Sequence, residues 1–214
     1  MKAFIKPNEL YRFFKDGMSI LVGGFLTNGT PEILIDALKE SGVTQLTIIC
    51  NDGGFPDRGV GKLIANHQVK KLIASHIGTN PLIPGLIQAG ELEVELVPQG
   101  TLIERIRAFA GGLGGILTPT GLKTLVEKDK RQIEVNGISY LLEEPLGADL
   151  AFVGGATCDD FGNVKYRQTM RNFNPIIAMA APLTLCQAKK TTLIDPNDVV
   201  THHALIDYIV LEEE

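Results

Sequence analysis

The stretch Met18-Ser19-Ile20-Leu21-Val22-Gly23-Gly24-Phe25-Leu26-Thr27-Asn28-Gly29-Thr30-Pro31 contains a strand, a loop and the start of a helix. Residues 18–22 form an apolar run after a turn, which is typical of a buried strand. Two glycines end that strand, and Thr30 followed by Pro31 predicts a helix with Thr30 as its N-cap. Parallel sheets covered by helices are built from such units.

The same alternation continues along the first half of the chain. The helix that opens at Pro31 is expected to end before Gly42, where a left-handed residue is favoured. Apolar strands are predicted at residues 46–50, 69–75 and 92–97, and helices at 7–15, 81–89 and 101–110. Thr101 and Glu104 form a capping box for the last helix. The pattern predicts an α/β fold, with one three-layer domain over residues 1–214 and a mostly parallel sheet.

The pattern changes after residue 110. The glycine-rich run at residues 111–121 is incompatible with a regular element. Residues 131–143 predict a β-hairpin that turns at Asn136-Gly137. Further strands are expected at residues 150–153, 164–166, 183–186 and 208–211.

Composition excludes several classes of protein. Among 214 residues, Lys and Arg number 20 and Asp and Glu number 25, so the net charge of −5 argues against a nucleic-acid binder. No apolar run reaches the length of a signal peptide or a membrane span, which predicts a cytoplasmic protein. Three cysteines without a Cys-x-x-Cys pair argue against a disulfide framework and a zinc site, so we expect no metal.

Two glycine-rich loops are candidate ligand sites. The first comprises Gly23, Gly24, Phe25, Leu26, Thr27, Asn28 and Gly29. It follows a strand and precedes a helix, where backbone N–H groups can hold an anion, but a tight turn without a ligand explains it equally well. The second comprises Gly112, Leu113, Gly114 and Gly115. Its glycines favour a functional loop, with a mobile hinge as the alternative.

Other residues that could carry chemistry have structural explanations. Glu40 lies at a predicted helix end, and the four histidines have no context that indicates catalysis. The acidic and basic residues of two further loops are expected to be turn residues: Asp52, Asp57, Arg58, Asp159 and Asp160. No Gly-x-Ser-x-Gly motif occurs, so the sequence offers no evident serine nucleophile.

Residues 16–31 resemble, position for position, the first signature of the family I coenzyme A (CoA) transferases. The likeness is to the A (alpha) subunit of two-subunit 3-oxoacid, acetoacetate or acetate CoA-transferases. It extends over nearly the whole chain, through SHIGTNP from Ser75, VPQGTLIERIR from Val97, GGLGGILTPTG from Gly111, GN-x-x-YR from Gly162 and RNFNP from Arg171. The second family signature, Ser-Glu-Asn-Gly, is absent from this sequence.

The resemblance implies half of an enzyme. The nucleophilic glutamate would belong to a beta subunit in an α2β2 assembly, and CoA would be a substrate rather than a permanently bound cofactor. The substrates implied are an acyl-CoA and a short carboxylic acid, such as acetate, butyrate or acetoacetate, as in short-chain fatty acid and ketone body metabolism.

The resemblance also implies roles for particular residues. The loop at residues 23–29 would contact CoA, and residues 112–115 would shape the acyl pocket. Gln99 follows a predicted strand and is a candidate oxyanion donor, with a turn residue beside Gly100 as the alternative. Two other functions remain open at this stage: a sugar-phosphate or metabolite-binding protein of related fold, and a self-sufficient hydrolase with a nucleophile of its own.

Overall fold

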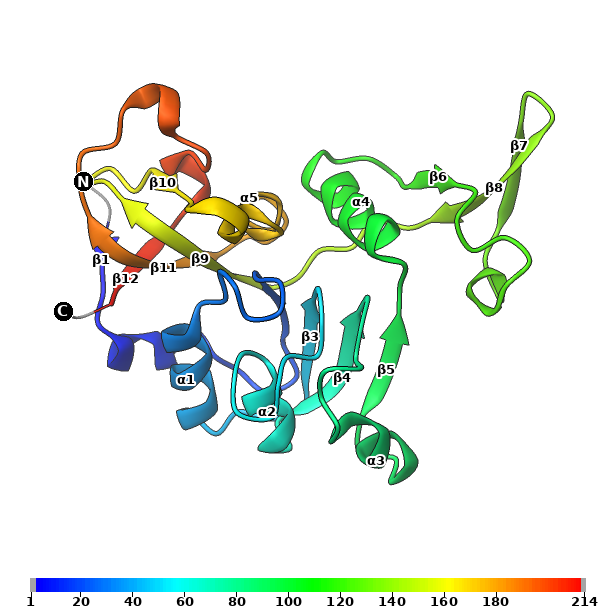
Figure 1. Cartoon of the computed structure of the whole chain (residues 1–214), viewed down its shortest axis with the longest axis horizontal. Helices are drawn as coiled ribbons and strands as arrows, with labels where there is room; N and C mark the ends of the chain where they lie inside the picture. The colour runs from blue at the N-terminus through cyan, green and yellow to red at the C-terminus, as the bar shows by residue number, and fades with distance from the viewer. Residues whose placement is uncertain (1–2, 213–214) are drawn as a thin grey trace.

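A computed structural model describes residues 3–212 of the chain, which build a nine-stranded sheet (Figure 1). The strand order is β1-β12-β11-β9-β2-β3-β4-β5, with all these neighbours parallel, and β10 pairs with β9 antiparallel. The bounds of its strands are β1 Ala3–Phe4, β2 Ser19–Val22, β3 Leu46–Cys50, β4 Val69–Ala74, β5 Glu93–Leu96, β9 Leu150–Cys158, β10 Val164–Lys165, β11 Thr184–Thr191 and β12 Tyr208–Leu211. The α/β class and the mostly parallel sheet are therefore confirmed.

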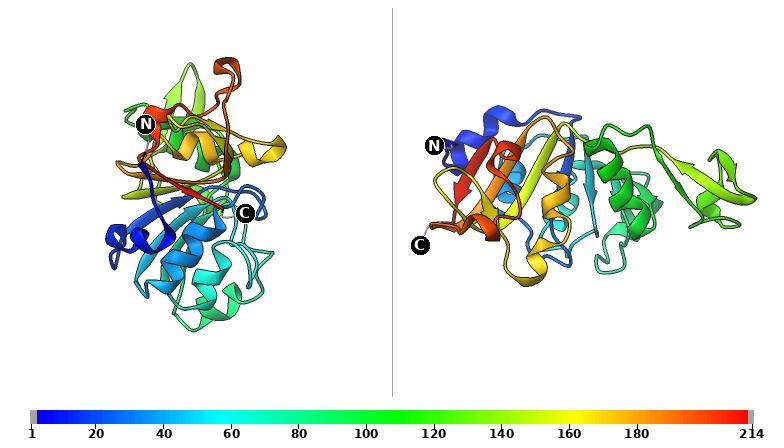
Figure 2. Two further views of the ribbon diagram at one scale, coloured as in Figure 1. Left: turned by 90° about the vertical axis from the view of Figure 1, so that its left-hand side faces the viewer. Right: turned by 90° about the horizontal axis from the view of Figure 1, so that it is seen from above.

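Helices cover both faces of this sheet and make three layers (Figure 2). The α-helices are α1 Glu32–Glu40, α2 Gly61–Ala65, α3 Ile83–Gln88, α4 Gln99–Ala110 and α5 Asn174–Ile177, and the 3-10 helices are η1 Pro7–Phe13, η2 Leu125–Glu127, η3 Gln168–Arg171, η4 Pro196–Asp198 and η5 His203–Leu205. Successive strand residues enter different cores: Ile20 and Val22 pack with α1, whereas Leu21 packs with α4 and α5. This alternation explains why the strands are apolar on both sides.

Both predicted helix N-caps are wrong, whereas the left-handed residue expected at Gly42 is confirmed by its φ of 71°. Pro31, not Thr30, occupies the N-cap position of α1, and the Thr30 side chain lies where a Cβ on Gly24 would be. Pro98 occupies the N-cap position of α4, so that helix begins two residues before Thr101. Thr101 is consequently a buried residue inside the helix rather than its cap.

A three-stranded antiparallel sheet projects from the main body as an arm (Figure 1). Its order is β6-β8-β7, formed by β6 Ile116–Thr118, β7 Gln132–Val135 and β8 Ile138–Glu143. The predicted hairpin is confirmed, with Asn136 and Gly137 at φ values of 52° and 76°, as its tight turn requires. The glycine-rich run is not wholly irregular, since its second half supplies β6.

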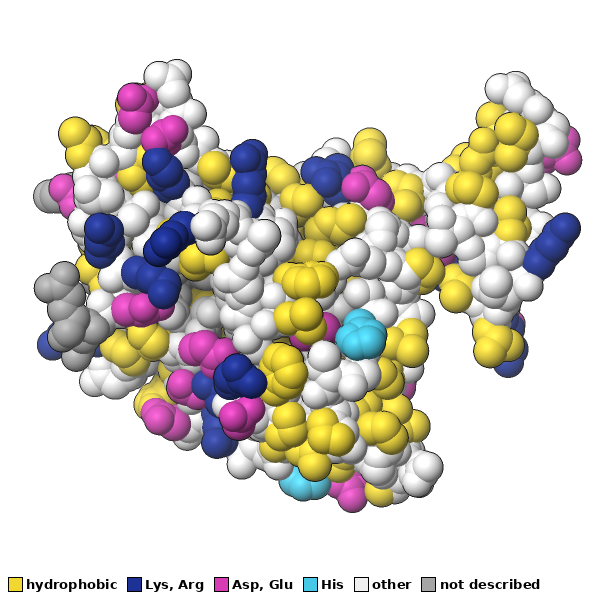
Figure 3. Space-filling model, in the orientation of Figure 1, with side chains coloured by type: hydrophobic (Ala, Val, Ile, Leu, Met, Phe, Trp, Pro, Cys, Tyr) yellow, Lys and Arg dark blue, Asp and Glu magenta, His cyan; other side chains and the backbone are white. Residues whose placement is uncertain are grey.

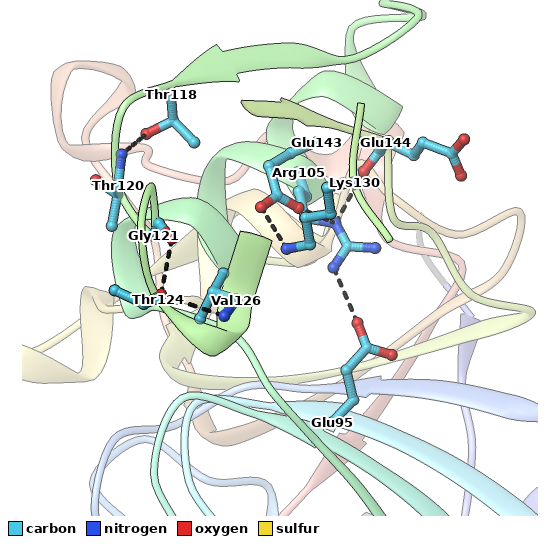
Figure 4. Close-up of polar contacts among 10 residues, drawn as sticks. All are labelled: Glu95, Arg105, Thr118, Thr120, Gly121, Thr124, Val126, Lys130, Glu143 and Glu144. Carbon is cyan, nitrogen blue, oxygen red and sulfur yellow. Dashed lines mark hydrogen bonds and ion pairs between the residues drawn. The ribbon is translucent and has the colours of Figure 1, made fainter. Parts of the chain in front are cut away.

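Arg105 of α4 fastens this arm to the sheet (Figure 4). Its Nε donates to the Glu144 carbonyl at 2.9 Å, and its Nη1 donates to Glu95 of β5 at 3.1 Å. The buried Glu143 carboxylate lies 4.0 Å from Arg105 and pairs with Lys130. Three strands alone would be marginally stable. The charged groups where the arm joins the main body therefore contribute to holding it in place.

The second half of the chain completes the sheet with longer strands than the sequence predicts. β9 and β11 run to Cys158 and Thr191 and pair along most of their length. The short α5 and η3 lie over β9 and reach the loop that follows β2. Within residues 3–212, no helix is both long and apolar enough to cross a bilayer.

Candidate functional site

The carboxyl ends of β2, β3 and β5 bring three polar segments together. They are the loop at residues 23–29, the Asn51-Asp52 pair after β3, and Gln99 at the start of α4. In open α/β sheets, ligands bind outside this edge. Of the residues expected from the sequence, the structure thus joins the first glycine loop and Gln99, and it adds Asn51 and Asp52 to them.

The loop at residues 23–29 folds into a tight hairpin. Phe25 and Asn28 exchange backbone hydrogen bonds of 3.1 and 2.9 Å. Between them Leu26 and Thr27 have φ values of 46° and 66°, a left-handed conformation that residues with a Cβ seldom adopt. A β-branched residue such as Thr27 is strained there, and such strain persists only where the surroundings hold it. The tight turn is therefore confirmed, and contact of this loop with a ligand stays a prediction.

Two asparagines of the RNFNP stretch hold this loop from one side. Asn172 accepts a hydrogen bond from Gly24 N at 3.2 Å and donates to Asn28 O at 2.9 Å. Asn174, which is fully buried, donates to Gly29 O at 2.9 Å and accepts from Gly154 N of β9 at 2.8 Å. These bonds give the two asparagines a structural role that their sequence positions alone do not reveal.

Asp52 holds the same loop from the other side. Its Oδ2 accepts from Leu26 N at 2.9 Å and from Asn51 Nδ2 at 2.8 Å, and its Oδ1 accepts from Gly54 N at 3.0 Å. The carboxylate is buried. Asp52 was expected to be only a turn residue, but it also bonds Leu26, which lies 26 positions away in the chain.

Gln99 reaches the edge through its side chain. Its Nε2 donates to Asn51 Oδ1 at 2.6 Å, and Ser75 Oγ donates to the Asn51 carbonyl at 2.7 Å. Gln99 is exposed, whereas Asn51 is buried. An amide has two N–H groups, so one bond to Asn51 leaves a second donor for a ligand.

A second hairpin stands beside the first. Residues 53–59 read GGFPDRG, the same Gly-Gly-Phe-x-x-x-Gly spacing as residues 23–29, and Phe55 and Arg58 exchange backbone bonds as Phe25 and Asn28 do. Glu32 of α1 accepts from Gly59 N at 2.8 Å and so ties this hairpin to the helix that follows the first. The repeated spacing is the signal in the sequence that could have identified this neighbour.

The glycine at the head of the first loop serves close packing. A Cβ on Gly23 would lie 1.8 Å from Asn174 Oδ1, so a larger residue would displace the buried amide. The missing side chain of Gly23 therefore makes room for Asn174.

The other glycine-rich candidate lies away from this edge. Gly112 and Leu113 close the far end of α4, where Leu113 N donates to Ala108 O at 2.9 Å and Gly112 has a φ of 66°. This is a helix C-cap of the Schellman type. Because the 12 residues of α4 span about 18 Å, residues 112–115 do not meet Gln99. Their role at an acyl pocket stays a prediction.

The thiol closest in sequence to this edge is unsuited to nucleophilic attack. Cys50 ends β3 and is fully buried beside Asp52; burial, with the carboxylate nearby, raises the pKa of its thiol well above the usual value. A thiol held neutral is a weak nucleophile. We therefore do not expect Cys50 to act as the nucleophile at this edge.

Comparison with known proteins shows what the chain resembles. Residues 5–212 match the family model described as Coenzyme A transferase. The chain is 51% identical over 205 residues to the acetate CoA-transferase subunit alpha of Escherichia coli (strain K12), covering 94% of this chain and 93% of that one. It is 52% identical over 211 residues to the acetoacetyl-CoA:acetate/butyrate CoA transferase alpha subunit of Clostridium acetobutylicum, covering 97% of each.

A solved structure shares the fold. An acyl-CoA transferase from Escherichia coli O157:H7 superposes with a TM-score of 0.86 at 22% sequence identity, over 99% of this chain. The match covers 47% of that protein, so this chain corresponds to slightly less than half of it.

Proposed function

The chain belongs to the coenzyme A transferase family, and from that premise we propose that it is the alpha subunit of a two-subunit enzyme. The enzyme transfers CoA from an acyl-CoA to a short-chain carboxylic acid, such as acetate, butyrate or a 3-oxoacid. The observation that carries the proposal is identity of about one half, over nearly the full length of both chains, with two alpha subunits named for such transfers.

The reaction proposed is covalent catalysis by a carboxylate of the partner. A glutamate of the beta subunit attacks the thioester carbonyl, giving an acyl–glutamyl anhydride and free CoA thiolate. The thiolate then attacks the glutamyl carbonyl and releases the donor acid. The acceptor acid takes CoA by the same steps in reverse, so the thioester energy is conserved and the proposed chemistry needs neither ATP nor a metal.

This chain would supply binding and electrostatic stabilisation. Each attack passes through a tetrahedral oxyanion, which is stabilised by donors fixed in advance. Gln99 offers an exposed amide already oriented by Asn51, and the braced loop at residues 23–29 would meet CoA at the same edge.

The shape of the chain supports an assembly with a beta subunit, which we propose to be α2β2. The 214 residues lack Ser-Glu-Asn-Gly, so the nucleophile must come from elsewhere. Apolar side chains are exposed along the arm and just before it, including Leu125 at 93% exposure, and Figure 3 shows apolar side chains on the surface of that projection. They are Leu113, Leu117, Leu125, Val135 and Ile138. Large exposed apolar areas are typical of subunit interfaces.

The cellular setting follows from the same proposal. Cys50, Cys158 and Cys186 are all free and buried, which supports a reducing compartment such as the cytoplasm. CoA would enter and leave as a substrate and would not remain bound as a cofactor.

The test is a substrate panel with the co-expressed pair of subunits. We expect CoA transfer from acetyl-CoA or acetoacetyl-CoA to acetate, butyrate or acetoacetate, followed by release of the corresponding acyl-CoA. A pure complex that binds CoA but transfers it to none of these acids would contradict the proposal.

A further inference from the structure

Asp52 is a junction between parts of the chain that are distant in sequence. Its carboxylate is 6% exposed and accepts hydrogen bonds from Leu26 N, Asn51 Nδ2 and Gly54 N, all between 2.8 and 3.0 Å. The donors lie on the first hairpin, on the end of β3 and at the head of the second hairpin. A buried carboxylate is stable only when its oxygens are so satisfied.

One of these bonds supports a strained turn. Leu26 and Thr27 both occupy the left-handed region, where glycine or asparagine is normally found. The neighbouring bonds from Asn172 reach Gly24 and Asn28, on either side of the turn, whereas Asp52 binds the amide of Leu26 within it. A charge-assisted bond at that amide opposes relaxation of the turn to an extended conformation.

The opposite side of the junction leads to Gln99. Asn51 donates to Asp52 with its amide nitrogen and accepts from Gln99 with its amide oxygen. If the Asn51 amide were rotated by half a turn, its nitrogen would face the Gln99 amide nitrogen, which is also a donor. The bond to Asp52 therefore fixes the orientation of the Asn51 amide. A continuous line of hydrogen bonds thus runs from Leu26 through Asp52 and Asn51 to Gln99.

We propose that Asp52 is a positioning residue that holds the loop at residues 23–29 in its left-handed form and, through Asn51, orients the amide of Gln99. This inference rests on the proposed function, in which the loop meets CoA and Gln99 faces the oxyanion. A carboxylate suits the junction because both of its oxygens accept hydrogen bonds there. An amide of the same shape would set its NH2 group against another donor whichever way it faced.

The first test is Asp52→Asn in the complex with the beta subunit. We expect KM for the acyl-CoA to rise about 10- to 100-fold, as befits loss of hydrogen bonds to a charged group, and kcat to fall as Gln99 loses its orientation. The control is Asp57→Asn, the same change five positions later, where the side chain is 78% exposed on the second hairpin. Equal kinetics for both variants would overturn the proposal.

A second variant separates loop positioning from general damage. Thr27→Gly removes the β-branched side chain from the left-handed position, so the turn depends less on Asp52. The rise in KM caused by Asp52→Asn should therefore be smaller in a Thr27→Gly background than in the wild-type background. An equal rise in both backgrounds would show that Asp52 does not act through the turn.

Hydrogen exchange tests the inference without any catalysis or any Asp52 variant. In the wild-type chain the Leu26 amide should exchange at least about 100-fold more slowly than in an unstructured peptide, although the hairpin lies at the surface. Exchange at the unstructured rate would overturn the proposal even if the complex is an active transferase. Slow exchange in a complex without transferase activity would instead refute the proposed function, while the positioning of the loop by Asp52 would still be supported.

Discussion

At the scale of single residues, Gln99 carries the chemical part of the account. Its amide is exposed at the carboxyl edge of the sheet and is oriented by the buried Asn51. Replacing Gln99 by Ala in the complex should lower kcat by about 10²–10³-fold, because an oxyanion donor acts on charge that develops in the transition state. Steady-state kinetics with saturating acyl-CoA measures this.

The control for Gln99 is Gln88→Ala. Gln88 is the exposed last residue of α3, near the amino end of β5, whereas Gln99 follows the carboxyl end of that strand. The complex should keep its kcat with Gln88→Ala. Wild-type kcat for Gln99→Ala in an assembled complex would show that Gln99 is a structural helix-start residue.

Gly23 makes a prediction about stability. A Cβ at residue 23 would collide with the buried Asn174 amide, so Gly23→Ala should destabilise the chain by about 1–3 kcal/mol through overpacking. Gly85→Ala is the matched change: it lies inside α3 with open space around it, and it should stabilise the chain by about 0.5–1 kcal/mol. Urea unfolding measures both, and equal midpoints would refute the packing argument.

At the scale of elements, Arg105 links the arm to the sheet. Its side chain is 12% exposed, and Arg105→Met would leave the buried Glu143 short of a positive neighbour and remove the bond to Glu144 O. We expect a loss of about 2–4 kcal/mol and faster amide exchange across β6, β7 and β8. Arg107→Met on the same helix removes a half-exposed pair with Glu104 and should cost about 0–1 kcal/mol. An arm as protected in Arg105→Met as in Arg107→Met would contradict this role.

Strands were more predictable than helix starts, for a physical reason. β3 and β12 have their predicted bounds, because a strand buried on both faces must be apolar throughout and this pattern is local. The predicted starts of α1 and α4 were wrong because Thr30 and Thr101 resemble N-caps in the local sequence. In the structure the Thr30 side chain lies beside Gly24, and Thr101 is buried. The five-residue α2 is too short for helical periodicity to show.

The candidate site was predictable in its loop but not in its supports. The glycines at residues 23–29 mark a tight strand-to-helix connection, and the family resemblance gave that loop its expected role. Gln99 was a candidate because its amide follows a predicted strand. Asp52, Asn172 and Asn174 bond to backbone groups of the loop at residues 23–29, which lie 26 to 148 positions away from them, so no local spacing reveals this role. The one local trace is the repeated Gly-Gly-Phe-x-x-x-Gly spacing of the second hairpin.

At the scale of the whole molecule, the chain presents amide and backbone donors at one edge of its sheet and an arm with exposed apolar side chains. In the proposed function, Gln99, the loop at residues 23–29 and the arm are this chain's contributions to an enzyme that a beta subunit would complete. The account therefore predicts that this chain and a beta subunit form a stable complex, detectable as a single species of higher mass in size-exclusion chromatography. Two subunits that elute separately at micromolar concentration would contradict it.

The most direct measurement compares CoA transfer by the purified chain, by a beta subunit that carries Ser-Glu-Asn-Gly, and by the two mixed. Acetyl-CoA or acetoacetyl-CoA is the donor, and acetate, butyrate or acetoacetate is the acceptor. Because the proposed mechanism assigns the glutamate to the partner and the donors to this chain, the account predicts turnover by the mixture and none by either subunit alone. Turnover by this chain alone, or a stable complex inactive with every acid, would contradict it.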